Sequence, residues 1–441
     1  MLPDYIAKSI PNPAGKRAPW YVNTAPTYAG IFLWIGFYES IGQGTLNRAN
    51  VGLCLLGLAV AGLLSYALYY YAPAMLGMKT GLPLYVVGSS TFGARGGYLM
   101  PGLLMGVLQI GWFAVSTYLA STFILKALSL PSAPATVPFA IAAIAWGYVM
   151  AWVGVKGIQY VARVSLALNI VPFLMILLVF LKTQPGVAAY TVAKPEPWVA
   201  FTIMMQIVLG FFATAGAAGA DFGMNSRNAH DVRMGGFVGI AIAVLYAGGL
   251  PLLSIAGARA MFPGMSGYNY SEVLGSIGGL LASVMFICYA VASIPSACFC
   301  AFIAGNSFAT MLPGVKRLSS TMIGATVAIV LAVTGVAANL VTFFQIVGAS
   351  FGPICGAMAA DYLLAGKKWA GPREGINFAG YGAWAAGFLV GVIPFLPVPE
   401  VWKTYSQPAT LYSLVTGFVV YIILAKAGLE SKPVPAVQRP A

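Results

Sequence analysis

The sequence predicts an all-α integral membrane protein with twelve transmembrane helices, and three observations support this fold class. The chain is 60% hydrophobic and 7% charged, with a mean hydropathy of +0.86, whereas a soluble domain needs far more surface charge. Its apolar runs have about 20 residues or more, which is enough to cross a hydrocarbon core of about 30 Å. The runs are continuously apolar and do not alternate, which favours helices over an outer-membrane barrel.

The expected helices, in chain order, lie at residues 27–47, 50–75, 99–129, 134–154, 159–182, 199–223, 235–260, 274–311, 319–340, 343–365, 377–397 and 407–428. The two longest must tilt or extend beyond the bilayer. A tail at 1–26 precedes the helices and a second tail at 429–441 follows them.

The charge distribution predicts that both tails are cytoplasmic. With the N-terminus inside, 17 of the 23 Lys and Arg residues fall on inside segments and 6 on outside segments, as the positive-inside rule requires. The first 25 residues are polar and proline-containing, so we expect no cleavable signal peptide and a multi-pass protein of the cell (inner or plasma) membrane. We interpret the net charge of +13 as a topology signal, so the expected partner is the lipid bilayer and not nucleic acid.

The five cysteines do not form a recognisable cross-link or metal motif. All five fall inside expected helices and none belongs to a CxxC pair. Cys298 and Cys300 are two residues apart on a helix and therefore point to different faces. We expect neither a disulfide framework nor a metal site.

The first expected helix carries a carboxylate near its middle. Glu39 follows Tyr38 in a segment with Gly36, Gly42 and Gly44. A carboxylate at bilayer depth costs about 3 kcal/mol on insertion scales, so it needs a pairing or functional reason. Glycines around an acid favour a break in the helix whose freed backbone groups face a cavity. The alternative is close helix packing, with Glu39 paired to a distant Lys or Arg.

The third expected helix carries an amide and an indole on one face. Gln109 and Trp112 are three residues apart, so they lie side by side on a helix. Together they could bind a flat polar ring, through hydrogen bonds at its edge and stacking on its face. Packing and inter-helix hydrogen bonding are the alternative for such a pair.

The sixth expected helix resembles the first in being interrupted by glycines. Phe211, Phe212 and Thr214 lie at its expected break, and Asp221 at its inner end is interpreted as a structural or gating acid. Helices 1 and 6 are five helices apart, which fits two inverted five-helix repeats, at 27–182 and 199–366, around a site at the bilayer midplane. These repeats make a ten-helix core at 27–366, followed by two additional helices at 377–428.

The eighth expected helix contains Pro295 among small polar residues that include Ser296 and Cys300. A proline in such a setting can open backbone carbonyls toward a cation or a substrate, although a simple kink is the alternative. Phe351-Gly352-Pro353 forms another flexible element in the tenth helix.

At residues 30–365 the chain resembles the nucleobase–cation symporter family 1, and within it the cytosine permease branch. The resemblance rests on three stretches taken together, which are MKTGLPLYVVGSSTFGARGGYLMPGLLMGVLQIGWF, GFFATAGAAGADFGMNSRNAHD and GPICGAMAADYLL. It implies a leucine-transporter-like core (APC superfamily) of two inverted repeats plus two extra helices. It also implies symport of purines, pyrimidines, hydantoins, allantoin or vitamin precursors with sodium or protons.

The resemblance also implies roles for individual residues. Gln109 matches the amide that bonds the base, Trp112 the aromatic that stacks on it, and Phe212 the aromatic on the opposite face. The remaining matched positions are Phe211 and Thr214 beside Phe212, Tyr38 and Glu39 at the helix 1 break, and Ser296 and Cys300 on helix 8.

Two departures from the family pattern concern the coupled cation. Ile294 and Pro295 stand where sodium-binding members have Ser or Thr, so the usual sodium ligands are absent. A titratable Glu39 is present on helix 1, where the cytosine branch has serine. These departures make Glu39 the candidate coupling group and favour protons over sodium.

The sequence therefore predicts a secondary transporter, and not an enzyme, that imports a small planar nitrogen heterocycle with H⁺ or Na⁺ and needs no other cofactor. A nucleobase such as cytosine or a purine is the expected substrate, and the protein is expected to be a monomer or a weak oligomer. One alternative is a transporter of the same fold for an amine, an amino acid or another heterocycle, such as a hydantoin, allantoin or a vitamin precursor. Another is a channel or a subunit of an energy-converting complex, which typically has rows of charged residues along several helices.

Overall fold

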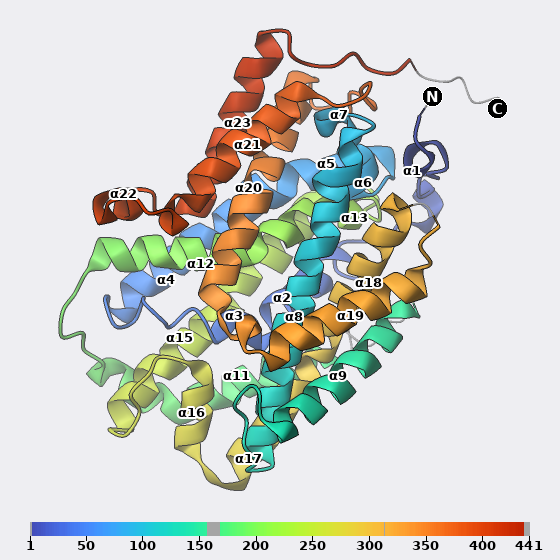
Figure 1. The fold of residues 1–441 in the computed structure, drawn as a ribbon. Coiled ribbons are helices and arrows are strands. Elements are labelled where there is room, and N and C mark those ends of the chain that lie inside the picture. The colour runs from blue at the N-terminus through green and yellow to red at the C-terminus, as the bar shows by residue number, and fades with distance from the viewer. Residues whose placement is uncertain (1, 157–167, 313, 436–441) are drawn as a thin grey trace.

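The computed structural model describes residues 2–156, 168–312 and 314–435. Within these ranges the regular elements are helices, accompanied by two isolated bridges that pair Ala18 with Ser226 and Arg373 with Pro433. The helices gather into one bundle (Figure 1). The all-helical membrane architecture predicted from hydropathy is confirmed.

Ten helical stretches among the described residues are long and apolar enough to cross a membrane. They are Val51–Thr80, Gly96–Ala127, Val137–Val155, Ile170–Ala189, Pro197–Ala217, Ala229–Met261, Gly279–Met311, Leu340–Leu364, Phe378–Phe395 and Ala409–Lys426. The shorter apolar helix α19 (Arg317–Val333) matches the ninth expected helix. The first expected helix is divided into two short pieces, and the start of the fifth lies outside the described residues.

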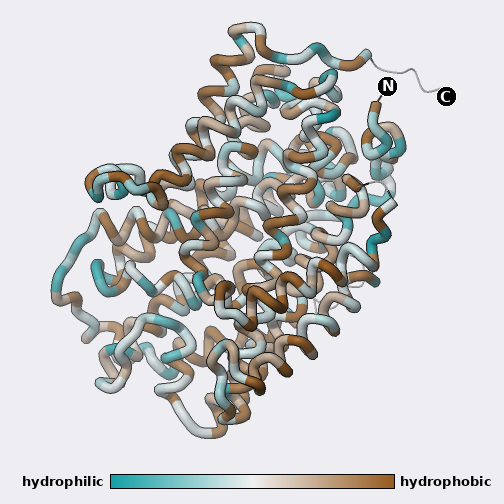
Figure 2. Tube along the Cα trace, viewed as in Figure 1, coloured by the Kyte–Doolittle hydropathy of each residue, from teal (hydrophilic) through white to brown (hydrophobic). Residues whose placement is uncertain are grey.

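The outer surface of the bundle is apolar, as contact with lipid requires. On α9 (Val137–Val155), Val137, Ile141 and Trp152 are 72%, 63% and 54% exposed. Hydrophobic residues follow the helices in Figure 2, whereas hydrophilic residues concentrate in the connections. Exposed apolar side chains on this scale would be unfavourable in water, so their natural surroundings are lipid chains.

Helix 1 is interrupted at two places, of which the glycine pattern predicted only the second. Helix α2 (Thr24–Phe32) ends before Trp34, which has an extended backbone (φ −76°, ψ 134°), and α3 (Ile35–Tyr38) follows. Helix α3 in turn ends at Tyr38, and residues 39–48 form turns in which Gly44 has a left-handed backbone (φ 72°), so the predicted break among the glycines around Glu39 is also present. Gly42 also allows close packing, because a side chain there would collide with the carbonyl oxygen of Tyr268.

Helix 6 is continuous where a break was expected. Helix α12 (Pro197–Ala217) runs through Phe211, Phe212 and Thr214, and the chain is interrupted only at Ala218 before α13 (Gly219–Gly223). A Cβ on Gly210 would lie 2.5 Å from the carbonyl oxygen of Phe344. Glycine is thus needed there for close helix packing, and the predicted break at the phenylalanines is wrong.

The predicted single helix at 274–311 is three helices. Helix α16 (Tyr270–Ile277) ends at Gly278, which has a left-handed backbone with φ of 70°, and is followed by α17 (Gly279–Ala292) and α18 (Ile294–Met311). A left-handed glycine ends a helix because it turns the chain away from the helix axis. The interruption between α17 and α18 lies at Ser293, next to Pro295, where the sequence indicated a kink or an opening.

The other helices of the bundle also have interruptions or short additions at their ends. Helix 2 is formed by α4 (Val51–Leu64), η2 (Ser65–Tyr70) and α5 (Tyr71–Thr80), and short helices α6 (Leu84–Val87) and α7 (Ser89–Phe92) connect it to the next. Helix 3 is α8 (Leu104–Ala127), preceded by η3 (Gly96–Tyr98) and η4 (Leu99–Leu103). The described part of helix 5 is α11 (Ile170–Thr183), followed by η5 (Gln184–Ala189). Helix 7 is formed by α14 (Ala229–Gly236), η6 (Phe237–Ile242) and α15 (Ala243–Met261).

The last helices pack closely together. Helix α20 (Leu340–Leu364) is continuous although it contains Pro353, and α21 (Phe378–Val392) and α23 (Ala409–Lys426) lie against it (Figure 1). The short α22 (Glu400–Tyr405) precedes α23. A Cβ on Gly387 or Gly417 would lie 2.5 or 2.6 Å from atoms of Pro353. Small residues therefore let α21 and α23 enclose the proline, and the tenth helix has no break there.

Both described chain ends lie on the same end of the bundle. The hydroxyl of Tyr5 donates to the Ala94 carbonyl at 2.7 Å, and the backbone N–H of Ala94 donates to the Arg373 carbonyl at 2.7 Å. Arg373 in turn pairs with Pro433 near the C-terminus. An even number of membrane crossings produces this arrangement. The predicted domain boundaries remain a prediction.

Candidate substrate-binding site

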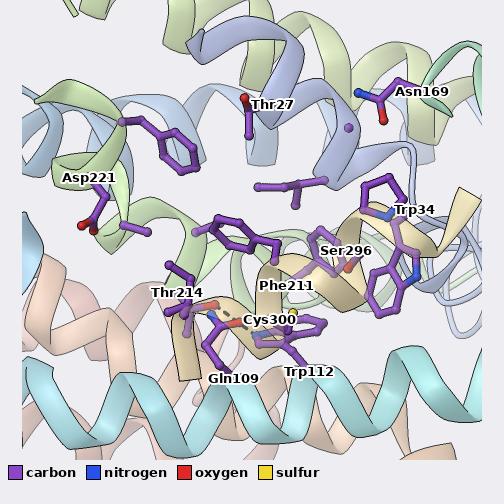
Figure 3. Close-up of a pocket in the computed structure, with 18 of the residues that line it drawn as sticks. Thr27, Trp34, Gln109, Trp112, Asn169, Phe211, Thr214, Asp221, Ser296 and Cys300 are labelled. Carbon is purple, nitrogen blue, oxygen red and sulfur yellow. Dashed lines mark hydrogen bonds between the residues drawn. The ribbon is translucent and has the colours of Figure 1, made fainter. Parts of the chain in front are cut away.

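A cavity of about 270 Å³ lies where the interruption of helix 1 faces α8, α12 and α18. Figure 3 shows Gln109 and Trp112 projecting from α8, with Thr27 and Asn169 on the far side of the cavity. The lining residues are Asn23, Thr27, Gly30, Ile31, Trp34, Gln109, Trp112, Asn169, Phe211, Thr214, Ala215, Ala218, Asp221, Phe222, Asn225, Pro295, Ser296, Phe299, Cys300 and Ile303.

Six of the nine sequence-predicted site residues line this cavity. They are Gln109, Trp112, Phe211, Thr214, Ser296 and Cys300. They come from three helices that are far apart in the sequence, so their convergence is a property of the tertiary structure. Phe212, Tyr38 and Glu39 lie elsewhere.

Trp112 is held tightly by its neighbours. Its indole N–H donates to the Thr214 hydroxyl at 3.1 Å (Figure 3), and its ring stacks on Phe344 with centroids 5.3 Å apart at 30°. Phe211 meets it edge to face, at 5.2 Å and 81°. These contacts fix the orientation of the indole and occupy its polar atom.

The Gln109 amide is poorly satisfied by the protein. Its nitrogen donates to the sulfur of Met105 at 3.5 Å, which is a weak hydrogen bond, and its oxygen has no partner. The side chain is 5% exposed and its amide oxygen is buried. A buried amide in this state is suited to bind a polar ligand edge.

Phe212 packs inside the protein and does not reach the cavity. It is 0% exposed and its ring stacks on Phe32, with centroids 5.5 Å apart at 15°. Successive residues on an α-helix point about 100° apart, so the cavity can receive either Phe211 or Phe212. In this structure the residue that faces it is Phe211.

Glu39 lies in a second, polar cavity of about 240 Å³. Its carboxylate accepts two hydrogen bonds from Ser271, at 2.8 Å from the backbone nitrogen and 2.6 Å from the hydroxyl. Ser271 lies in the first turn of α16, where free N–H groups and the helix dipole favour a negative charge. Glu39 is thus paired with a helix N-terminus and does not contact the residues of the first cavity.

Tyr38 lies beside Glu39 and packs against two other tyrosines. The ring centroids are 5.0 Å from Tyr270 and 5.7 Å from Tyr289, both with edge-to-face geometry. Tyr38 therefore contributes to the core between α3, α16 and α17 and lies outside the candidate site.

Several lining residues were not identified from the sequence. Trp34 occupies the interruption of helix 1, and Asn169 donates to the Pro26 carbonyl at 3.2 Å. An asparagine within the apolar run at 159–182 was a usable signal for Asn169. Trp34 gave no such signal, because tryptophan is ordinary in a membrane helix. Asp221, interpreted as a gating acid, also lines the cavity.

The charge of the lining is low. Among the described residues that form the cavity wall, Asp221 is the single acid and no Lys, Arg or His is present. The hydroxyl of Ser293, at the interruption between α17 and α18, donates to the Tyr289 carbonyl at 3.0 Å and so already has a partner. Among the described residues no group of three or more His, Cys, Asp or Glu side chains could hold a metal ion. The cavity thus suits a neutral or cationic solute.

Comparison with known proteins gives matches over most of the chain. A family profile described as "Permease for cytosine/purines, uracil, thiamine, allantoin" matches residues 11–419. The cytosine permease of Escherichia coli (strain K12) is 25% identical over 365 residues, which cover 80% of this chain and 79% of that protein.

Two solved structures have the same fold. Mhp1, a nucleobase-cation-symport-1 family transporter in a closed conformation with bromovinylhydantoin bound, aligns with a TM-score of 0.69 at 16% identity, over 95% of this chain and 94% of that one. A Na⁺-coupled sialic acid symporter aligns with a TM-score of 0.63 at 12% identity, over 98% and 93% of the two chains. The leucine-transporter-like fold class predicted from the sequence is confirmed.

Proposed function

We propose that this protein, which belongs to the family of permeases for cytosine/purines, uracil, thiamine and allantoin, imports a small planar nitrogen heterocycle with nucleobase-like edges. Its family makes it a multi-pass membrane transporter and not an enzyme. The observation that carries this proposal is the convergence of Gln109, Trp112 and Phe211 on one cavity. An amide supplies hydrogen bonds to a ring edge, and aromatic side chains supply contact with ring faces.

The size of the cavity supports a small solute. Its volume of about 270 Å³ lies just below the roughly 300 Å³ at which sites for drug-sized ligands begin. The lining combines apolar rings with a few convergent polar groups, which is the usual composition of a small-molecule site. The interruptions at Trp34 and Ser293 lie beside it and would allow the flanking helix segments to change their angles during alternating access.

A thermal-shift screen tests the substrate. Purified protein is heated in detergent with cytosine, uracil, hypoxanthine, allantoin, hydantoin or thiamine, with and without sodium, at two pH values. Ligand binding to the folded state raises the melting temperature by mass action, by the equivalent of about 2.7 kcal/mol at 100 times Kd. A screen in which no heterocycle shifts the melting temperature would overturn the proposal.

An amine transporter is the second candidate, and Asp221 is the observation that favours it. A carboxylate in a cavity wall without basic side chains attracts a cation. Equilibrium binding of small primary amines, compared between the wild type and Asp221→Asn, separates the two. Amine binding that is lost in Asp221→Asn, together with no binding of neutral heterocycles, would favour this candidate.

We propose that transport is driven by a cation gradient, with Glu39 as the candidate group for proton coupling. Ile294 and Pro295 provide no side-chain oxygen for sodium, a cation that prefers hard oxygen ligands. Because Glu39 is bonded to α16 and lies apart from the first cavity, it would act on access to the site and not by touching the substrate.

Proteoliposomes distinguish the two cations. We expect uptake driven by an imposed pH gradient to exceed uptake driven by a sodium gradient, and to fall in Glu39→Gln. Sodium-driven uptake that ignores pH and survives Glu39→Gln would refute proton coupling through this residue.

We further propose that both termini are cytoplasmic in the cell membrane and that the transporter works as a monomer or weak oligomer. Cysteines introduced at positions 17 and 435 of a cysteine-free variant should resist a membrane-impermeant reagent in intact cells and react after permeabilisation. Labelling of either position in intact cells would contradict this orientation.

A further inference from the structure

Two residues that line the candidate cavity each carry a buried polar atom with no hydrogen-bond partner among the described residues. These atoms are the indole nitrogen Nε1 of Trp34 and the amide oxygen Oε1 of Gln109. Trp34 is 2% exposed and Gln109 is 5% exposed. Unpaired buried polar groups cost free energy and are rare in folded proteins, so a ligand that pairs with them gains affinity.

The two atoms have complementary chemistry. An indole N–H only donates, whereas an amide oxygen only accepts. They come from different parts of the fold, Trp34 from the interruption of helix 1 and Gln109 from α8. A ligand that satisfies both must present an acceptor to Trp34 and an N–H group to Gln109.

The local structure is built around the Trp34 ring. The extended backbone of Trp34 turns its side chain out of the helix, and a Cβ on Gly36 would lie 2.5 Å from the Trp34 ring. Trp112 meets the ring edge to face at 5.8 Å and 71°, and Phe211 stacks on it at 6.1 Å and 28°. Gly36 thus provides the space that the indole occupies.

Trp112 cannot supply the same donor. Its N–H is already bonded to Thr214, and one of its faces is covered by Phe344. Of the two indoles in the cavity wall, Trp34 is the one with an unpaired N–H.

We propose that Trp34 determines specificity by donating its indole N–H to an acceptor on the substrate, while Gln109 Oε1 accepts from a substrate N–H. The substrate class is therefore a heterocycle that carries both a carbonyl acceptor and a ring N–H, as lactams do. This inference rests on the proposed function, in which the cavity binds a heterocycle.

The test compares each lactam with the parent ring that lacks its carbonyl oxygen and lactam N–H. Cytosine is paired with 4-aminopyrimidine and hypoxanthine with purine, and Kd is measured by equilibrium binding to purified protein. The wild type should bind the lactam of at least one pair about tenfold or more tightly, the equivalent of one or more hydrogen bonds.

The central variant is Trp34→Phe, which keeps an aromatic ring and removes the N–H. It should bind the lactam about tenfold more weakly and the parent ring with little change, so that the preference for the lactam shrinks. Trp146→Phe is the matched control, because Trp146 on α9 also has a buried, unpaired indole N–H but does not line the cavity. Its affinities should be those of the wild type.

Gly36→Ala supplies a second variant, since the added methyl group would displace the Trp34 ring without removing it. It should also lose the preference for the lactam. The comparison of each lactam with its parent ring in the wild type needs no variant at all, so the proposal is testable even if both variants fail to fold.

The outcomes separate this inference from the proposed function. If the wild type binds heterocycles without preferring lactams, or if Trp34→Phe keeps the full preference, the role of Trp34 is overturned and the proposed function stands. If the wild type binds no heterocycle, both fall.

Discussion

Replacing Glu39 by glutamine should loosen α16 from the end of helix 1. The carboxylate of Glu39 accepts hydrogen bonds from the backbone nitrogen and the hydroxyl of Ser271, at 2.8 and 2.6 Å. Glutamine keeps one acceptor oxygen for the backbone N–H and replaces the other oxygen with an amide group. The variant therefore loses the charge at the helix N-terminus and the charge-assisted part of both bonds.

The expected cost follows from these contacts. The two hydrogen bonds to the charged group contribute about 3–6 kcal/mol together and the helix-terminus interaction about 0.3–1 kcal/mol, whereas two neutral bonds made by glutamine return about 2 kcal/mol. The net loss is about 3 kcal/mol, which corresponds to roughly 150-fold more frequent opening of α16. Ser271→Ala removes only the hydroxyl bond to the carboxylate, so we expect a smaller loss of about 2 kcal/mol.

Hydrogen exchange of the backbone amides in residues 270–277 measures this opening. Their exchange should accelerate in Glu39→Gln and, less strongly, in Ser271→Ala. Ser276→Ala is the control, because Ser276 bonds only to the Glu272 carbonyl within α16. Unchanged exchange in both Glu39→Gln and Ser271→Ala would refute the conclusion that this carboxylate anchors the helix.

Two further predictions concern the candidate site and the stability of the fold. Gln109→Ala should weaken substrate binding by about 1–3 kcal/mol and Trp112→Ala by about 1 kcal/mol or more, measured as Kd in detergent. Unchanged affinity in both folded variants would rule out this cavity. Asp361→Asn should lower the melting temperature by the equivalent of about 1.5–3 kcal/mol, because the buried Arg373 guanidinium loses one charged partner at 3.0 Å and keeps the other, Glu430, at 2.9 Å. Lys403→Ala breaks an exposed ion pair and should change the melting temperature by the equivalent of less than about 1 kcal/mol. Equal effects of Asp361→Asn and Lys403→Ala would contradict the conclusion that burial makes the Asp361–Arg373 pair important.

Much of the architecture was predictable because the bilayer acts on local composition. A helix must satisfy its own backbone hydrogen bonds in lipid and must be about 20 residues long, so the apolar runs identify the spans without knowledge of their partners. The pair Gln109 and Trp112 was also predictable, since residues three apart share a helix face whatever surrounds them.

Glycines and aromatic residues were less informative, because their role depends on what packs against them. Gly210 in the sequence fits either a break or a close contact, and the approach of the Phe344 backbone decides for the contact. Phe211 and Phe212 are equal candidates until the rotation of α12 directs one to the cavity and the other to Phe32.

The sequence by itself determined that this chain is a helical membrane transporter, where its spans lie, and that Glu39 needs a partner. Only the tertiary structure decided that this partner is the N-terminus of α16, and that Trp34 lines the cavity in which Gln109 and Trp112 also lie. The physical reason is how far along the chain each interaction reaches. The cost of placing a residue in lipid depends on that residue and its close neighbours, whereas a hydrogen bond between positions 232 residues apart depends on how the whole bundle packs.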